Sequence, residues 1–266
     1  MQSLEAVQNY AQIEGIYYLI LFFIALFAGF IDSIVGGGGL ITLPALLASG
    51  VPPLLALATN KLQSVFGSFT AAATYFHKRS LKFLALGVLF TALGASFGSF
   101  AVMLISDKHL KIIVLACLSL IFIYTALKPN LGKEKGVQRL DIRAFHLIFG
   151  LLIGFWDGFL GPGTGSFWIF ACVLFLGLSM KEASINTKIL NFTSNAVALG
   201  IFLYFYEVLW AVGILMGLGQ MIGAFLGSKL VLKTEAKFIK ALFLIVVFLT
   251  LLKVGWDYLK ELNIIH

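Results

Sequence analysis

The chain has 266 residues, of which 60% are hydrophobic and 12% are charged, and its mean hydropathy is +1.01. Because soluble domains contain about 25% charged residues, this composition excludes an ordinary soluble protein. It predicts an integral membrane protein whose main partner is the lipid bilayer. The formal net charge of +7 comes mostly from basic residues in short loops between apolar segments, where orientation signals belong. We therefore expect no nucleic-acid partner.

The apolar segments predict an all-α membrane protein, since one crossing helix needs roughly 20 apolar residues. Glu5 and Glu14 precede the first segment, and no basic residue does, so we do not expect a cleaved signal peptide there. The segments of suitable character are 16–34, 54–76, 83–104, 110–127, 144–160, 182–205, 208–228 and 236–256, with short apolar runs at 40–49 and 166–177.

Three motifs occur twice, in the same order and at nearly constant separation. GFIDSIVGGGG (29–39) is followed in the second half by GFWDGFLGPGTG (154–165). TNKLQS (59–64) corresponds to NTKILN (186–191), and GASFGS (94–99) corresponds to GAFLGS (223–228). The sequence therefore predicts an internal duplication.

The duplication predicts a single membrane domain with a first repeat at 1–127, a cytoplasmic linker at 128–143 and a second repeat at 144–266. Basic residues cluster at 77–82, at 128–143 and at 229–240, and we place these loops in the cytoplasm. The loop at Glu207, which corresponds to 77–82, then lies outside. This predicts inverted repeats, each a broken or re-entrant helix pair followed by three transmembrane helices, with both termini periplasmic.

The first copy of the duplicated motif predicts a helix that is broken inside the membrane. Four consecutive glycines, Gly36, Gly37, Gly38 and Gly39, weaken a helix because each costs roughly 0.8–1 kcal/mol relative to alanine. Short helices that restart near Leu40 and Ser166 would point their partly positive N-termini at the breaks. Such ends are typical of anion sites in transporters.

Four charged residues, Asp32, Lys61, Asp157 and Lys188, lie deepest in the apolar segments and form two repeat-related sets. Charges at bilayer depth face a cavity or a partner, because burying one costs at least ~2.5 kcal/mol. In one interpretation the lysines bind an anion. In the other, two structural Asp–Lys pairs hold each broken helix to the span that follows it. Both interpretations stay open at this point.

Amide side chains add donors to the same segments. Asn60 neighbours Lys61, while Thr187, Asn191 and Asn195 recur every four residues and share one helix face. They are candidates for binding anion oxygens or, alternatively, for hydrogen bonds between helices.

Glycines spaced by four residues permit close helix contact. They lie at positions 94 and 98 and at positions 219, 223 and 227. We expect these ladders to pack within the chain, and the alternative is a homodimer face. The two cysteines and four histidines form no ligand set and no nucleophile–base pair, so we expect no metal, no cofactor and no enzyme.

The chain resembles the sulfite exporter TauE/SafE family of bacterial membrane permeases. The resemblance rests on GFIDSIVGGGGLITLPALLASG with ALATNKLQS, and on GFWDGFLGPGTGS with TKILNFTSN. It implies an inner-membrane protein that moves sulfite, sulfonates or related anions, with export as the expected direction. The implied site residues are Asp32, Gly36, Gly37, Gly38, Gly39, Asn60, Lys61, Asp157, Gly161, Gly163, Lys188 and Asn191, to which the helix face adds Asn195.

We therefore expect a transporter for small anions. Three alternatives stand beside it: a proton-coupled cation transporter that uses Asp32 and Asp157, a nontransporting membrane scaffold, and a membrane-embedded enzyme. Neutral substitutions at both lysines would be tolerated by a scaffold. A cation transporter would lose its site if the two aspartates became asparagines.

Overall fold

The computed structural model describes residues 15–49, 51–76, 81–104 and 136–233, and five single helical positions between 241 and 256. The predicted span 110–127, most of the predicted span 236–256 and residues 128–135 of the linker lie outside the described residues. The elements of the first half are α2 (Gly15–Val35), α3 (Gly39–Ala48), α4 (Pro53–Thr74) and α5 (Leu81–Val102). Those of the second half are α7 (Ile142–Phe159), α8 (Thr164–Leu176), α9 (Met180–Phe205) and α10 (Trp210–Lys233).

Local signals in the sequence set the ends of these helices. Pro53 occupies the first turn of α4, where its missing N–H leaves no bond unmade. Ser179 and Glu182 form a capping box at the start of α9, in which each side chain accepts a hydrogen bond from the backbone N–H of the other. Gly177 ends α8 in the left-handed conformation, with a φ of 66°.

Five of the described helices, α2, α5, α7, α9 and α10, are long and apolar enough to cross a membrane. The predicted crossing at 54–76 forms the 22-residue α4, but its hydropathy is reduced by Asn60, Lys61 and Gln63, and it is not among the five. With 21 residues, α2 is long enough to cross alone, at about 1.5 Å per residue. The predicted re-entrant pairing of 16–34 with 40–49 stays a prediction.

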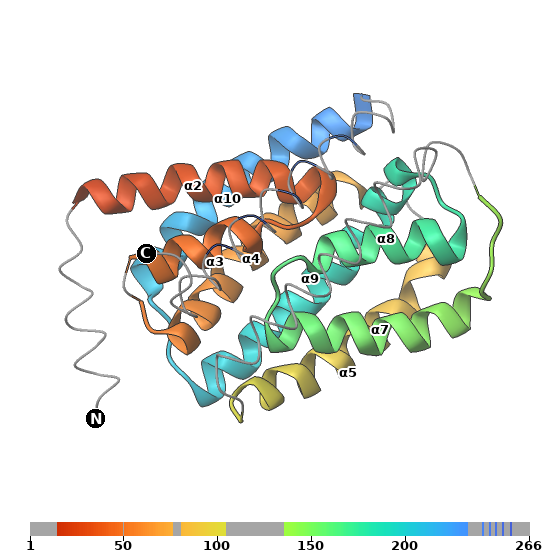
Figure 1. Ribbon diagram of the computed structural model, residues 1–266, viewed down its shortest axis with the longest axis horizontal. Coiled ribbons are helices and arrows are strands. Elements are labelled where there is room, and N and C mark those ends of the chain that lie inside the picture. The colour runs from red at the N-terminus through yellow and green to blue at the C-terminus, as the bar shows by residue number, and fades with distance from the viewer. Residues whose placement is uncertain are drawn as a thin grey trace.

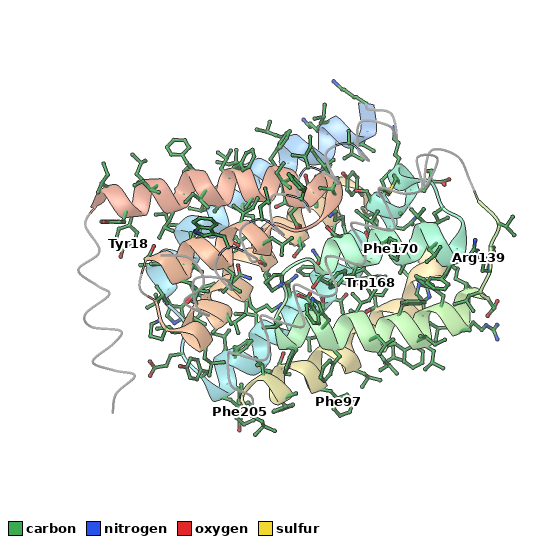
Figure 2. The ribbon with its side chains drawn as sticks, viewed as in Figure 1. Tyr18, Phe97, Arg139, Trp168, Phe170 and Phe205 are labelled. Carbon is green, nitrogen blue, oxygen red and sulfur yellow. The ribbon has the colours of Figure 1, made fainter. Side chains whose placement is uncertain are left out.

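The polarity of the molecule is that of a protein in lipid. Large apolar side chains lie on its periphery, as Figure 2 shows for Phe97 and Phe205, which are 65% and 53% exposed. All four deep charges are buried, with Lys61 only 1% exposed. Apolar side chains outside and charges inside confirm the all-α integral membrane class.

The two halves exchange their packing partners. α5 of the first half packs along α7 of the second, and α10 of the second packs along α2 of the first. α4 and α9 contact each other between these two pairs (Figure 1). The two halves therefore interlock through reciprocal contacts, while their opposite orientation across a membrane stays a prediction.

Candidate functional site

The two helix breaks meet in the interior of the molecule. Between α2 and α3, Gly36 and Gly37 have φ of 77° and 95°, a conformation that favours glycine. Gly36 lies directly against the backbone of Gly165 at the start of α8, so no side chain fits between the two breaks. The hydroxyl of Ser166 donates to the carbonyl of Val35 across the same contact, at 3.1 Å. The observed helix starts, Gly39 and Thr164, lie one and two residues before the predicted ones.

Donors from other helices bind the last carbonyl groups of α2, where the intrahelical ladder runs out; the Asp32 carbonyl also accepts from the Gly36 amide, at 2.9 Å. Ser184 Oγ donates to the Ile34 carbonyl at 2.6 Å, and Tyr75 Oη donates to the Ser33 carbonyl at 3.2 Å. Lys188 Nζ donates to the Asp32 carbonyl. Lys188 therefore acts as a positively charged cap on a helix C-terminus, where the helix dipole favours a cation.

Lys61 has a different environment from its repeat mate. Its ammonium forms an ion pair with Asp157 at 2.5 Å and donates to Asn195 Oδ1 at 3.3 Å. The second carboxylate oxygen of Asp157 accepts from the Ser194 hydroxyl. The structural alternative expected each lysine to pair with the aspartate of its own half. The observed pair corrects this expectation, because Lys61 on α4 contacts the aspartate of the other half. A sequence motif brings Asp32 and Lys61 close along the chain, but the interlocked packing of the halves decides which charges meet.

The two aspartates also differ in what they hold. Asp32 Oδ1 accepts from the Gly38 amide at 2.9 Å, so a negative charge already lies at the N-terminus of α3. Within the described residues, neither oxygen of Asp157 accepts from an amide of the 161–165 break. The backbone amides at the N-terminus of α8 therefore bind no aspartate oxygen among the described residues, and the Lys61–Asp157 ion pair lies beside this break. A Cβ added to Gly161 would be 2.6 Å from Lys61 Nζ.

Amide side chains complete the polar centre. Asn60 Oδ1 accepts from Thr42 Oγ1 and from Gln63 Nε2, both at 2.7 Å. Asn195 Nδ2 donates to the Asn191 carbonyl at 2.7 Å. Thr187, which shares their face, donates to Ala183 in its own helix. The amides are thus partly engaged in local bonds and still border the central space.

A central cavity collects most of the predicted site residues. Three predicted site residues do not line it. Gly36 packs against the backbone of Gly165, the Gly38 amide donates to Asp32, and Lys188 caps the end of α2. The predicted residues that line it are Asp32, Gly37, Gly39, Asn60, Lys61, Asp157, Gly161, Gly163, Asn191 and Asn195.

Sequence reasoning missed several residues at this centre. Ser64, Thr164, Gly165 and Gln220 also line the cavity, and Ser194 holds Asp157. A single glutamine in the apolar run 208–228 was the available signal for Gln220, because a polar side chain at membrane depth faces a cavity or a partner. Chemically, this arrangement is a buried cation whose counter-ion is a carboxylate, next to a helix N-terminus. It suits the binding of an ion that displaces one member of the pair.

Comparisons with known proteins agree with this architecture. The sequence profile described as "Sulfite exporter TauE/SafE" matches residues 21–254. "Probable membrane transporter protein ORF9" of Sinorhizobium sp is 46% identical over 228 residues, which are 85% of this chain and 87% of that protein. "Probable membrane transporter protein YfcA" of Escherichia coli K12 is 42% identical over 229 residues, 85% of each chain.

A "Probable membrane transporter protein" of Haemophilus influenzae is 39% identical over 244 residues, which are 90% of this chain and 94% of that protein. No solved structure matches the chain. The chain is a multi-pass membrane transporter and belongs to the sulfite exporter TauE/SafE family.

Proposed function

We propose that this protein transports a small sulfur-containing or related organic anion, such as sulfite or a sulfonate, across the bacterial inner membrane. The observation that carries the proposal is the position of Lys61. Its ammonium is buried, lies beside the N-terminal break of α8, and has an aspartate as its counter-ion. An anion that enters the cavity meets a cation and a helix N-terminus together.

Asp157 is the residue that the substrate replaces. In the empty cavity it keeps Lys61 paired, since a buried ammonium without a counter-ion is costly. When the anion binds, Lys61 transfers its contact to the substrate, and Asp157 keeps the hydrogen bond from Ser194. Asn191 and Asn195 on α9 border the same space. Asn195 Nδ2 donates to the carbonyl and to Oδ1 of Asn191, so the Asn191 amide is the further donor to anion oxygens.

The two breaks have unequal roles in this proposal. Asp32 occupies the amide end of α3, whereas no aspartate oxygen accepts from the described backbone of the second break. The anion therefore binds on the side of α8, and the first break supplies the wall against which α8 is held. Lys188 positions the end of α2 through the Asp32 carbonyl and contacts no substrate.

We place the two halves in opposite orientations across the membrane, so that movement of one half against the other exposes the cavity alternately. We propose export as the direction, in keeping with the family resemblance. The inside-negative potential favours the exit of an anion that moves alone, by about 2.3 kcal/mol per charge for 100 mV.

Reconstituted protein tests the proposal. Proteoliposomes loaded with radiolabelled sulfite should lose it faster than protein-free vesicles, and Lys61→Met should reduce the flux at least tenfold. The matched control is Lys229→Met, because Lys229 lies exposed on α10, over the ring of Phe225. Unchanged flux in Lys61→Met would exclude the role given to this lysine.

A cation transporter is the second candidate, and one specific observation favours it. Among the described residues, the ionisable side chains that line the cavity are two carboxylates, Asp32 and Asp157, and one ammonium, Lys61. The Asp32→Asn variant in the same vesicles decides between the two. An anion transporter should keep its anion flux within about threefold of wild type in this variant. A cation transporter should lose its cation flux, because the variant removes a carboxylate ligand of the cation.

A further inference from the structure

The cavity has one lining side chain that neither the ion pair nor the helix breaks explain. Gln220 lies in the middle of α10, is 2% exposed and borders the same space as Lys61 and Asp157. Its Oε1 is buried and has no hydrogen-bond partner among the described residues. A buried carboxamide oxygen without a partner is costly, so its persistence in a cavity needs an explanation.

The neighbouring helices make room for this side chain. A Cβ on Gly67 of α4 would be 2.6 Å from Gln220 Cγ and 2.9 Å from its Cδ. A Cβ on Gly29 of α2 would be 2.8 Å from the same Cγ. Two glycines from two helices thus form the slot through which Gln220 reaches the cavity. An ordinary packing position would not require both of these side chains to be absent.

The internal duplication shows how the surroundings of Gln220 differ from those of the equivalent residue in the other repeat. Gly67 and Ser194 are equivalent positions, since each lies six residues after the lysine of its repeat. Thr91 and Gln220 are also equivalent, since each lies three residues before the first glycine of the matched GASFGS and GAFLGS motifs. In the second half the serine hydroxyl binds Asp157, and Thr91 does not line the cavity. On α4 of the first half, Gly67 stands where α9 has this serine, and the side chain of Gln220 from α10 of the second half packs over it.

We propose that Gln220 contacts the transported anion and determines specificity at this site. It supplies a hydrogen bond to the oxyanion from α10, whereas Lys61 of α4, paired with Asp157 of α7, and the start of α8 supply charge. The unpartnered Oε1 is an acceptor and cannot bind an oxyanion, so the contact uses the other end of the carboxamide, whose Nε2 carries two N–H donors. Because Oε1 has no partner among the described residues, it does not fix which end of the carboxamide faces the ligand. This inference rests on the proposed anion transport and adds to it a ligand contact on α10.

The test is a binding titration of the purified full-length protein with sulfite and with methanesulfonate. Gln220→Met keeps an unbranched chain of similar length but removes the amide. Thr91→Val is the matched control, because Thr91 Oγ1 is likewise buried without a hydrogen-bond partner among the described residues and lies outside the cavity lining. Gln220→Met should weaken binding about tenfold or more, as expected for one bond to a charged ligand.

The thermal midpoint of the empty protein separates this role from a structural one. Gln220→Met should leave the midpoint unchanged or raise it, since an unpartnered polar group is removed, and Thr91→Val should keep wild-type affinity. Should Gln220→Met fail to fold, Gln220→Asn withdraws the amide by one methylene and should also weaken binding. Wild-type affinity in a folded Gln220 variant overturns the inference and leaves the anion site standing. If wild-type protein binds neither anion, the proposed function itself fails.

Discussion

Lys61 and Lys188 occupy equivalent positions in the two repeats and have different surroundings. One forms an ion pair with a carboxylate at the cavity wall, and the other donates to a backbone carbonyl at the end of a helix. Equal sequence motifs therefore do not imply equal roles. Asp32 Oδ1 accepts from the Gly38 amide, whereas Lys188 donates to the Asp32 carbonyl and, among the described contacts, forms no hydrogen bond with the Asp32 carboxylate.

This difference predicts opposite profiles for two matched substitutions. Lys188→Met should destabilise the protein by about 1–3 kcal/mol, because the Asp32 carbonyl keeps the Gly36 amide but loses a buried hydrogen bond from a charged donor, while anion affinity in the folded protein stays within about threefold. Lys61→Met should weaken anion binding at least tenfold. Thermal unfolding in detergent and a binding titration measure the two effects. Equal loss of affinity in both variants would contradict the division of roles.

At this scale the sequence predicted most of the residues that gather at the centre but not their pairing. Motif spacing brings Asp32 close to Lys61 along the chain, whereas Lys61 contacts Asp157, 96 residues away. That contact depends on how α4 lies against the second half, which no local pattern encodes. Gln220 was missed for a related reason: its access to the cavity depends on glycines in two other helices.

At the scale of the helices, the glycine ladders are the contacts between the halves. A Cβ on Gly98 of α5 would overlap the carbonyl of Phe155 on α7. A Cβ on Gly223 of α10 would overlap the carbonyl of Leu26 on α2. Both ladders thus face a helix of the same chain, and a homodimer through Gly-rich helices stays a prediction. The helix bounds were predictable because apolar length, proline and glycine are local signals, but the choice of packing partner was not.

These crossings predict a large effect for a single methyl group. Gly98→Ala and Gly223→Ala should each lower stability by about 1–3 kcal/mol or more, because a packed backbone has to move aside. Gly200→Ala on α9 is the control, since a Cβ there meets nothing within 4 Å. It should be neutral or stabilising by about 0.5–1 kcal/mol. Thermal midpoints of the three purified variants provide the comparison, and an unchanged midpoint in Gly223→Ala would rule out the tight crossing.

At the scale of the whole molecule, the interlocked halves place the cavity at their common centre. Each half supplies a break, and neither break is complete alone, since Gly36 packs on Gly165 and Ser166 donates to Val35. The duplication was readable from repeated motifs, because it is a property of the sequence itself. Its orientation across the bilayer was inferred from loop charge.

The length of α9 bears on one part of this prediction, the crossing between the linker and the loop at Glu207. The linker contacts the end of α8, just before α9, through a hydrogen bond from the Gly136 amide to the Gly177 carbonyl, at 2.7 Å. α9 then extends for 26 residues, about 39 Å at about 1.5 Å per residue, to the exposed Glu207. Arg139 is exposed at the linker end, and Figure 2 places it far from Phe205. Because α9 is apolar and long enough to cross, the two positions should lie on opposite sides of the membrane.

Single cysteines can test this arrangement in a background in which Cys117 and Cys172 are replaced. We expect Glu207→Cys to react with a charged, membrane-impermeant maleimide in intact cells, because this loop has no basic cluster and belongs outside. Arg139→Cys should react only after the membrane is opened, since the basic linker belongs inside. Both cysteines are placed at exposed positions, so a failure to react reflects the membrane barrier and not burial. Labelling of both cysteines in intact cells would refute the crossing by α9, and labelling of Arg139→Cys alone would reverse the proposed orientation.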